Sequence, residues 1–198
     1  MIKKLLQLKK LKLVYVLGKD REEAADLIFR LTRDGSVAKI EQPLLGFKKI
    51  LMFPGKIFIL SDNNFKLEKL KKFFSLFCEV IVLVNSDSIE REKEIVSLLG
   101  KDNTLLINDD CKERISAKRM RFLSYGFNKE ANFYISDLSI NQKTNFKLNY
   151  EGSTIPVWIE EKINKDDILK VSSVLGVGVI LGFNFINLAQ KIKKLYNN

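Results

Sequence analysis

The chain has 198 residues, 46% of them hydrophobic, and its 34 Lys and Arg exceed its 24 Asp and Glu for a net charge of +10. This hydrophobic content supports a sizeable core and excludes wholesale disorder. The absence of histidine excludes histidine metal sites and both Ser-His and Cys-His catalysis. Two cysteines are too few for a disulfide framework, so we expect a reduced, cytoplasmic protein.

Neither of the two segments that could act as a membrane signal has the required pattern. Lysines interrupt every apolar run in residues 1–13, so these residues do not predict a signal peptide. The most apolar stretch, residues 171–183, is shorter than a membrane-spanning helix and follows Lys170. We therefore expect a buried core helix there and no integral membrane insertion.

Strand and helix patterns alternate along the first half of the chain. In chain order they predict a strand at 14–17, a helix at 22–33, a strand at 57–60, a helix at 67–77, a strand at 80–84, a helix at 89–99 and a strand at 104–107. The four strands are apolar and rich in β-branched residues, which indicates burial on both faces in the centre of a parallel sheet. The fold class is therefore α/β, with a mostly parallel sheet flanked by helices.

The pattern changes in the second half. Short alternating segments at 122–125, 132–138, 145–150 and 154–159, separated by turn signals, predict an antiparallel β-hairpin subregion. Helices are predicted at 166–181 and 186–196, interrupted at Gly182. We thus expect one domain with a lead-in helix at 1–12, a parallel core at 13–120, antiparallel hairpins at 121–160 and C-terminal helices at 163–198.

Several short motifs occur in a fixed order. The predicted strand at 79–85 ends in Asn85, and Lys93 lies in the helix that follows; further on come Asn108-Asp109-Asp110, Tyr125-Gly126-Phe127 and Ala131-Asn132. In order and spacing this set resembles the central domain of the Mur ligases, ATP-dependent amide ligases that build the peptidoglycan stem peptide. The D-alanyl-D-alanine-adding branch looks closest. The resemblance covers the central domain only and implies its P-loop-like α/β fold, without the flanking UDP-sugar and amino-acid-binding domains.

The phosphate loop of that family reads Thr-Gly-Thr-x-Gly-Lys-Thr, whereas residues 17–23 here read LGKDREE. Only Gly18 matches, and Glu22 and Glu23 replace the lysine and the magnesium-binding hydroxyl. Two alternatives follow: an altered loop that binds ATP through Lys19 and Arg21, or an ordinary helix start capped by Asp20. We favour the helix start, because like charges 4 Å apart repel by roughly 4 kcal/mol at an effective dielectric of 20, and carboxylates stabilise a helix N-terminus.

The metal-site positions of the family are altered as well. The strand-end Glu position falls at Leu60, and Asp62 would substitute only with a register shift. Lys93 matches a family lysine that helps hold a second metal, but it also fits a solvent-facing helix position. Asn108 and Asp110 match positions near the nucleotide, or form turn interactions with their own backbone; these two alternatives stay open.

The helix that the resemblance places beside adenine begins with Asp166 in place of the family's His-Asn, and we expect Asp166 to be its N-cap. We expect no metal and no cofactor, with ATP and Mg²⁺ bound only if the family activity survives. A vestigial nucleotide site would comprise Gly18, Lys19, Arg21, Asn108 and Asp110.

Three functions remain open from the sequence. The first is a degenerate Mur-type central domain, non-catalytic, with a binding or scaffold role near cell-wall ligases. The second is an active ligase component with a remodelled phosphate loop, whose missing domains come from another chain. The third is a basic protein that holds nucleic acid or an anionic surface through its lysine-rich faces.

Overall fold

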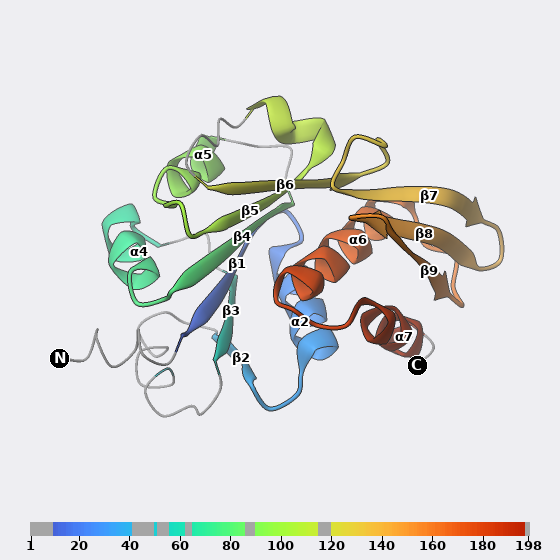
Figure 1. The fold of residues 1–198 in the computed structure, drawn as a ribbon, viewed down its shortest axis with the longest axis horizontal. Helices are drawn as coiled ribbons and strands as arrows, with labels where there is room; N and C mark the ends of the chain where they lie inside the picture. Colours follow the sequence, from blue (N-terminus) through green and yellow to red (C-terminus); the bar gives the residue numbers. More distant parts are fainter. Residues whose placement is uncertain are drawn as a thin grey trace. The chain divides into compact units, whose positions relative to one another are not determined.

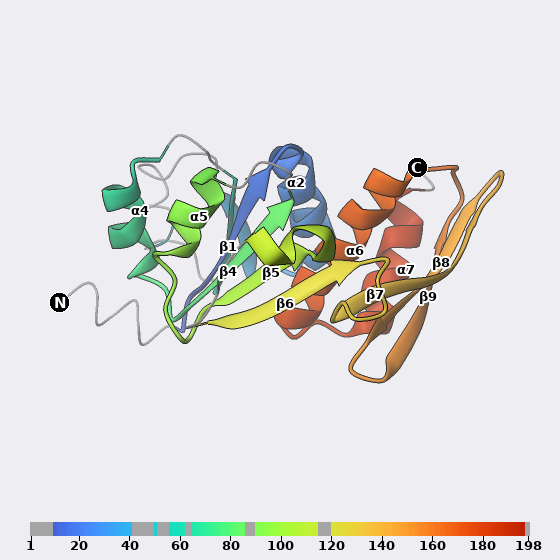
Figure 2. The same ribbon diagram turned by 90° about the horizontal axis from the view of Figure 1, so that it is seen from above.

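The computed structural model describes residues 10–40, 50, 56–61, 65–85, 90–114 and 120–196. The predicted lead-in helix at 1–12 lies mostly outside these ranges, and Lys12 belongs to the first strand. The chain divides into two compact units, the first comprising Met1–Leu105 with Arg114–Phe122 and the second Leu106–Glu113 with Leu123–Asn198. Figures 1 and 2 show the elements of each.

The first unit is built on parallel strands. Its strand order is β2-β3-β1-β4-β5, and β1 pairs in parallel with both β3 and β4. The strands are β1 (Lys12–Gly18), β2 (Val37–Ile40), β3 (Ile57–Ser61), β4 (Glu79–Asn85) and β5 (Thr104–Asn108), whose last three residues belong to the second unit. The four predicted strands are thus confirmed as neighbours, and β2 is an additional strand whose four residues carry too little pattern to predict it.

Helices cover both faces of this sheet. Figures 1 and 2 show α2 (Arg21–Thr32) on one face and α4 (Leu67–Phe74) and α5 (Glu90–Val96) on the other. Side chains pointing to both faces, such as Val14 and Tyr15, have no exposed surface. Burial on both faces explains why the strand sequences are apolar throughout rather than alternating.

The second unit continues from β5 in the strand order β5-β6-β7-β8-β9. It contains most of η1 (Asp109–Arg114) and of β6 (Arg121–Gly126), together with β7 (Phe133–Ile140), β8 (Thr144–Tyr150), β9 (Ser153–Ile159), α6 (Lys165–Ile180) and α7 (Phe185–Leu195). Strands β7, β8 and β9 pair antiparallel, as predicted. Glu151 and Gly152 both have positive φ, 47° and 77°, the conformation that a two-residue hairpin turn requires.

The prediction of antiparallel pairing from residue 121 is wrong for β6, which pairs in parallel with β7. The reason lies in the connecting loop. The side chain of Asn132 accepts a hydrogen bond from the Ser124 backbone N–H at 2.9 Å, so the loop returns the chain to the middle of β6 before β7 begins. The new strand then runs in the same direction as β6. Sequence alternation cannot reveal this direction.

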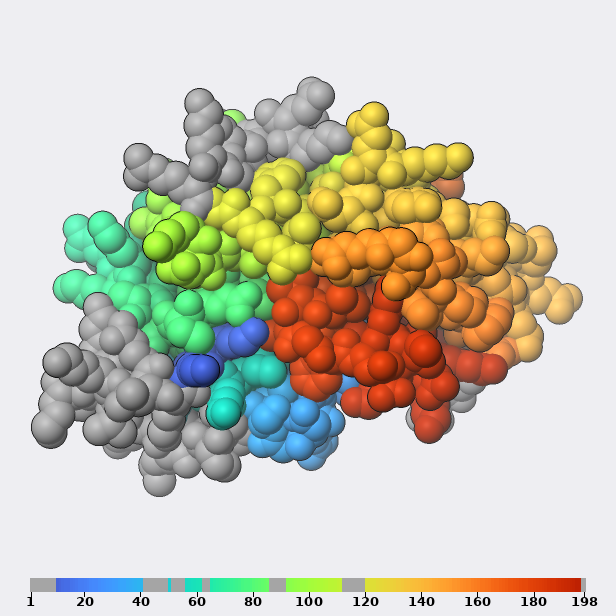
Figure 3. Space-filling model, viewed as in Figure 1, coloured from blue at the N-terminus to red at the C-terminus, as the bar shows by residue number. Residues whose placement is uncertain are grey.

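The apolar segment at 171–183 forms most of helix α6, which is buried as predicted. Val171, Val174 and Leu175 have no exposed surface. A Cβ added at Gly176 would lie 3.2 Å from Leu106 and 3.4 Å from Phe133, so the glycine permits close packing. In Figure 3 the atoms of α6 and α7, in red, lie directly beside those of β7–β9, in orange. In the described part of the chain, no helix is both long and apolar enough to cross a membrane.

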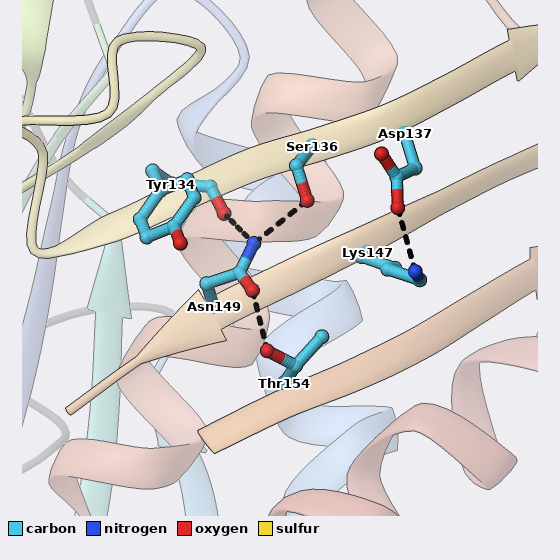
Figure 4. Close-up of polar contacts among 6 residues, drawn as sticks. All are labelled: Tyr134, Ser136, Asp137, Lys147, Asn149 and Thr154. Carbon is cyan, nitrogen blue, oxygen red and sulfur yellow. Dashed lines mark hydrogen bonds and ion pairs between the residues drawn. The ribbon is translucent and has the colours of Figure 1, made fainter. Parts of the chain in front are cut away.

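A buried amide joins the three antiparallel strands. The Asn149 side chain is on β8; its Nδ2 donates to the Tyr134 carbonyl at 3.1 Å and to Ser136 Oγ at 3.0 Å on β7. Its Oδ1 accepts from Thr154 Oγ1 on β9 at 2.6 Å. Figure 4 shows this network, together with the Lys147–Asp137 ion pair beside it. The sequence does not single out Asn149, because a buried amide resembles an exposed one until its partners are known.

Candidate functional site

The predicted nucleotide-site residues of the first unit lie around the connection between β1 and α2. Strand β1 ends at Gly18, whose φ is 109°. Glycine adopts this conformation readily, whereas a residue with a side chain would be strained. Lys19 and Asp20 form a turn, and helix α2 begins at Arg21. The connection between strand and helix therefore contains two residues.

Hydrogen bonds close this turn on itself. The Lys19 backbone N–H donates to the Asn85 carbonyl at the end of β4 at 3.1 Å, and Arg21 Nη1 donates to the Gly18 carbonyl at 3.5 Å. The guanidinium of Arg21 thus folds back over the turn, and its buried Nε has no hydrogen-bond partner among the described residues. The three predicted residues Gly18, Lys19 and Arg21 do lie together, and the Lys19 backbone N–H and the Arg21 guanidinium both donate to backbone carbonyls of this unit.

The first turn of α2 is acidic, as a helix start favours. Glu22 and Glu23 are exposed, and Glu22 lies 3.7 Å from Lys39 of β2, which also pairs with Asp26. The carboxylates therefore face the helix N-terminus and a lysine of this unit. Asp20 is the N-cap residue, as predicted, but its side chain makes no capping hydrogen bond.

Two of the metal-site candidates in the first unit, Leu60 and Lys93, lie among the described residues. Leu60 is completely buried in β3, followed by the buried Ser61, and Asp62 lies outside the described residues. Lys93 is exposed on α5, as expected for a solvent-facing helix lysine. Across the described ranges, no group of three or more Asp, Glu, Cys or His side chains could hold a metal ion.

In the second unit, Asn108 and Asp110 lie together where β5 meets η1. The Asn108 Oδ1 accepts from the Asp110 backbone N–H at 3.1 Å. This is the turn interaction that the sequence left as one of two alternatives. Both side chains are at least partly exposed, and the structure gives them a local structural role.

The residue between them, Asp109, is the buried member of this motif and was not singled out from the sequence. Its side chain is 5% exposed, and its Oδ2 accepts from Asn128 Nδ2 at 2.9 Å. A Cβ added at Gly126 would lie 3.2 Å from the Asp109 Cβ, so β6 passes close to the carboxylate-bearing residue. The adjacent pair of aspartates was the available signal, but it does not tell which of the two is buried.

The N-terminus of α6 differs from its prediction by two positions. Asn164, not Asp166, is the N-cap, and its Oδ1 accepts from the Asp167 backbone N–H at 2.8 Å. Asp166 lies in the first turn, where its charge favours the positive end of the helix. The Nζ of Lys165 is 6.0 Å from the centre of the Phe127 ring, which is 37% exposed.

No protein-family model matches the chain, and no curated protein sequence matches it. Solved structures do share its fold. MurF from Acinetobacter baumannii superposes with a TM-score of 0.72 at 10% identity, over 98% of this chain and 49% of that one. MurF ligase from Thermotoga maritima in complex with ADP gives 0.68 at 18% identity, over 95% and 51%. A pseudomurein peptide ligase type C from Methanothermus fervidus gives 0.66 at 13% identity, over 98% and 51%.

The chain spans about half the length of these structures. Identities of this size establish the fold alone. The fold is therefore Mur-ligase-like, with a mostly parallel α/β sheet, flanking helices and an antiparallel hairpin set.

Proposed function

We propose that the chain is a Mur-ligase-type central domain that has lost ATP-dependent ligation and serves as a non-catalytic binding or scaffold component near peptidoglycan-precursor ligases in the cytoplasm. The observation that carries the proposal is the two-residue connection between β1 and α2. Solved structures with this fold are named as ligases, and one of them is in complex with ADP.

A phosphate cradle needs several backbone N–H groups that converge on the ligand, and glycines that let the backbone approach it. Here the Lys19 N–H already donates to Asn85, and helix α2 begins two residues after the strand. The nearest side chains to the helix N-terminus include the carboxylates of Glu22 and Glu23. A polyphosphate placed there would be repelled by these two carboxylates, which lie next to Lys19 and Arg21.

The residues present also do not fit a Mg²⁺–nucleotide complex. Magnesium is held by carboxylates and hydroxyls together with phosphate oxygens. Glu23 stands in place of the loop hydroxyl, and the described residues contain no carboxylate cluster. We therefore assign no reaction step to a nucleotide.

Calorimetric titration of the full chain with ATP, with and without Mg²⁺, tests the proposal. We expect a dissociation constant no tighter than about 1 mM. Glu22→Lys alone is not expected to restore binding, because Arg21 still stands where a glycine would permit close backbone approach. Tight, Mg²⁺-dependent binding that is weakened by Lys19→Ala or Arg21→Ala would overturn the proposal in favour of an active ligase with a remodelled loop.

We further propose that the chain derives from the D-alanyl-D-alanine-adding branch and that its partners are cell-wall ligases or a chain carrying the missing domains. Two MurF structures are among those that share the fold. Sedimentation of the chain mixed with purified MurF, and separately with a ligase of another branch, tests both points. We expect a complex with MurF; selective binding to the other ligase would contradict the branch assignment.

A further inference from the structure

The positive charge of the molecule is divided unequally between the two compact units. The second unit contains 10 Lys and Arg and 10 Asp and Glu, so its net charge is zero. The first unit contains the other 24 basic and 14 acidic residues. The entire excess of +10 therefore belongs to the first unit. A net charge concentrated in this way attracts anionic partners.

Four of the ten basic residues of the second unit form ion pairs with nearby carboxylates. Lys147 lies 2.6 Å from Asp137, Lys170 lies 3.0 Å from Asp167, and Lys193 lies 3.7 Å from Glu160, which also pairs with Lys143. These pairs reduce the field that the second unit presents to a polyanion. The attraction is thus a property of the first unit.

Within the first unit, helix α4 concentrates unmatched basic side chains. Four exposed lysines form what we call the lysine face: Lys66, Lys69, Lys71 and Lys72. None of the four makes an ion pair with another described residue, and Glu68 is the single acidic residue of the helix. Glu68 is also exposed, so the four lysines and this one carboxylate give the outer surface of the helix a net charge of +3.

The lysine face is held in place by the aromatic core beneath it. Leu70, Phe73 and Phe74 are buried, and Phe74 packs edge-on against Tyr15 of β1 with ring centres 5.4 Å apart. Phe73 packs in the same manner against Phe77 at 5.2 Å. The apolar side of α4 is therefore committed to the core, and the helix offers a partner charge without a hydrophobic surface to insert.

In the described part of the first unit no large aromatic side chain is exposed, which favours a lipid surface over nucleic acid. Single-strand binding uses exposed aromatic side chains that stack on bases. Among described residues, the exposed large hydrophobic side chains are Phe127, Trp158 and Ile186, and all three are in the second unit. Clusters of four or more lysines on a helix match the diffuse negative potential of an anionic headgroup layer.

We propose that the lysine face of α4 docks the first unit onto the surface of an anionic lipid bilayer, by electrostatic attraction and without insertion. This inference is independent of the proposed function, because it requires neither the loss nor the retention of nucleotide binding.

Co-sedimentation of the full chain with lipid vesicles tests the proposal. Vesicles with about 30% phosphatidylglycerol in phosphatidylcholine provide the anionic surface, and pure phosphatidylcholine provides the neutral one. We expect binding to the anionic vesicles at about 50 mM NaCl, loss of binding at about 500 mM, and none to neutral vesicles. No binding to anionic vesicles at low salt would overturn the proposal.

A pair of charge-matched variants locates the surface. Replacing Lys66, Lys69, Lys71 and Lys72 by Gln should lower the vesicle partition coefficient at least about tenfold. The control replaces Lys129, Lys162, Lys165 and Lys194 of the second unit by Gln, which removes the same charge, and should retain binding within about twofold. Equal losses in the two variants would show that net charge rather than the lysine face determines binding, and would overturn the assignment.

Fluorescence anisotropy with labelled single-stranded and duplex DNA tests nucleic acid as the alternative partner. We expect only weak binding that disappears by about 150 mM salt. Binding to either DNA that persists at that salt while anionic vesicles remain unbound would replace the lipid surface by nucleic acid. Circular dichroism of both variants verifies that each retains its fold.

Discussion

Single polar side chains fix the geometry of the second unit. Asn149 is 6% exposed and joins β7, β8 and β9 through three hydrogen bonds. A buried amide without hydrogen-bond partners destabilises the folded state. The loss of one of these bonds therefore costs more through the unsatisfied polar group that remains than through the small net contribution of the bond itself.

We predict that Asn149→Ala lowers the free energy of unfolding by about 1–3 kcal/mol, because it removes three side-chain hydrogen bonds from buried polar groups. Urea denaturation followed by circular dichroism measures this change. The matched control is Asn145→Ala on the same face of β8, whose side chain makes no hydrogen bond to another described residue; its cost should stay below about 0.5 kcal/mol. Equal costs for the two variants would contradict the structural role of Asn149.

Glu160 gives a second residue-scale prediction, concerning pH. The hydrogen bond from Lys143 is the main cause that lowers the pKa of Glu160 below its ordinary value of 4.5. Because the folded-state pKa is the lower one, the stabilisation is present above pH 4.5 and is lost as the pH falls through the folded-state pKa.

The melting temperature of Glu160→Gln should therefore fall below that of the unmodified chain at pH 7, and the difference should disappear at strongly acidic pH. Thermal unfolding at a series of pH values measures it. Glu161→Gln removes the same charge from the neighbouring position and should show a smaller difference at pH 7. A melting-temperature difference between Glu160→Gln and the unmodified chain that increased as the pH fell would contradict this prediction.

At the scale of elements, the helix N-termini differ in how they are satisfied. Asn164 caps α6 through a hydrogen bond to the Asp167 N–H, whereas Asp20 at the start of α2 makes no such bond. Both residue types are favoured at N-caps, so sequence alone does not distinguish them. The tight turn after Gly18 explains the difference at α2, because its backbone is held by Asn85.

We predict that Asn164→Ala destabilises the protein by about 1 kcal/mol and that Asp20→Ala costs less than about half of that. Chemical denaturation of the two variants, measured side by side, gives the comparison. A larger loss for Asp20→Ala would mean that its side chain caps α2 in solution.

At the scale of the whole molecule, the sequence predicted most elements and missed the relations between some of them. The strands at 14–17, 57–60, 80–84 and 104–107 were predictable because burial on both faces leaves a continuous apolar pattern. The direction of β6 was not, because it depends on the bond between Asn132 and Ser124. In the candidate site, the helix start at Arg21 was predicted. The hydrogen bond from the Arg21 guanidinium back to the Gly18 carbonyl was not predicted.

The concentration of charge in one unit gives a prediction for the complete chain. A net charge of +10 destabilises a compact state through self-repulsion, which salt screens. We predict that the melting temperature rises when NaCl is raised from about 20 mM to about 200 mM. The rise should be smaller after Lys66, Lys69, Lys71 and Lys72 are replaced by Gln. A melting temperature that fell with salt would show that attractive pairs, and not repulsion, dominate.

The antiparallel set β7–β8–β9 has a consequence for the order in which the chain folds. Each of its pairings joins segments that are adjacent in sequence, with Asn149 opposite Tyr134 on one side and Thr154 on the other. In the parallel sheet, by contrast, Lys12 pairs with Ile57 and Glu79, which are far from it in the sequence. Local contacts form before distant ones because they close shorter loops. We therefore expect the hairpins to form before β1 pairs with β3 and β4. A molecule that stopped folding at that stage would expose the apolar strands of the first unit.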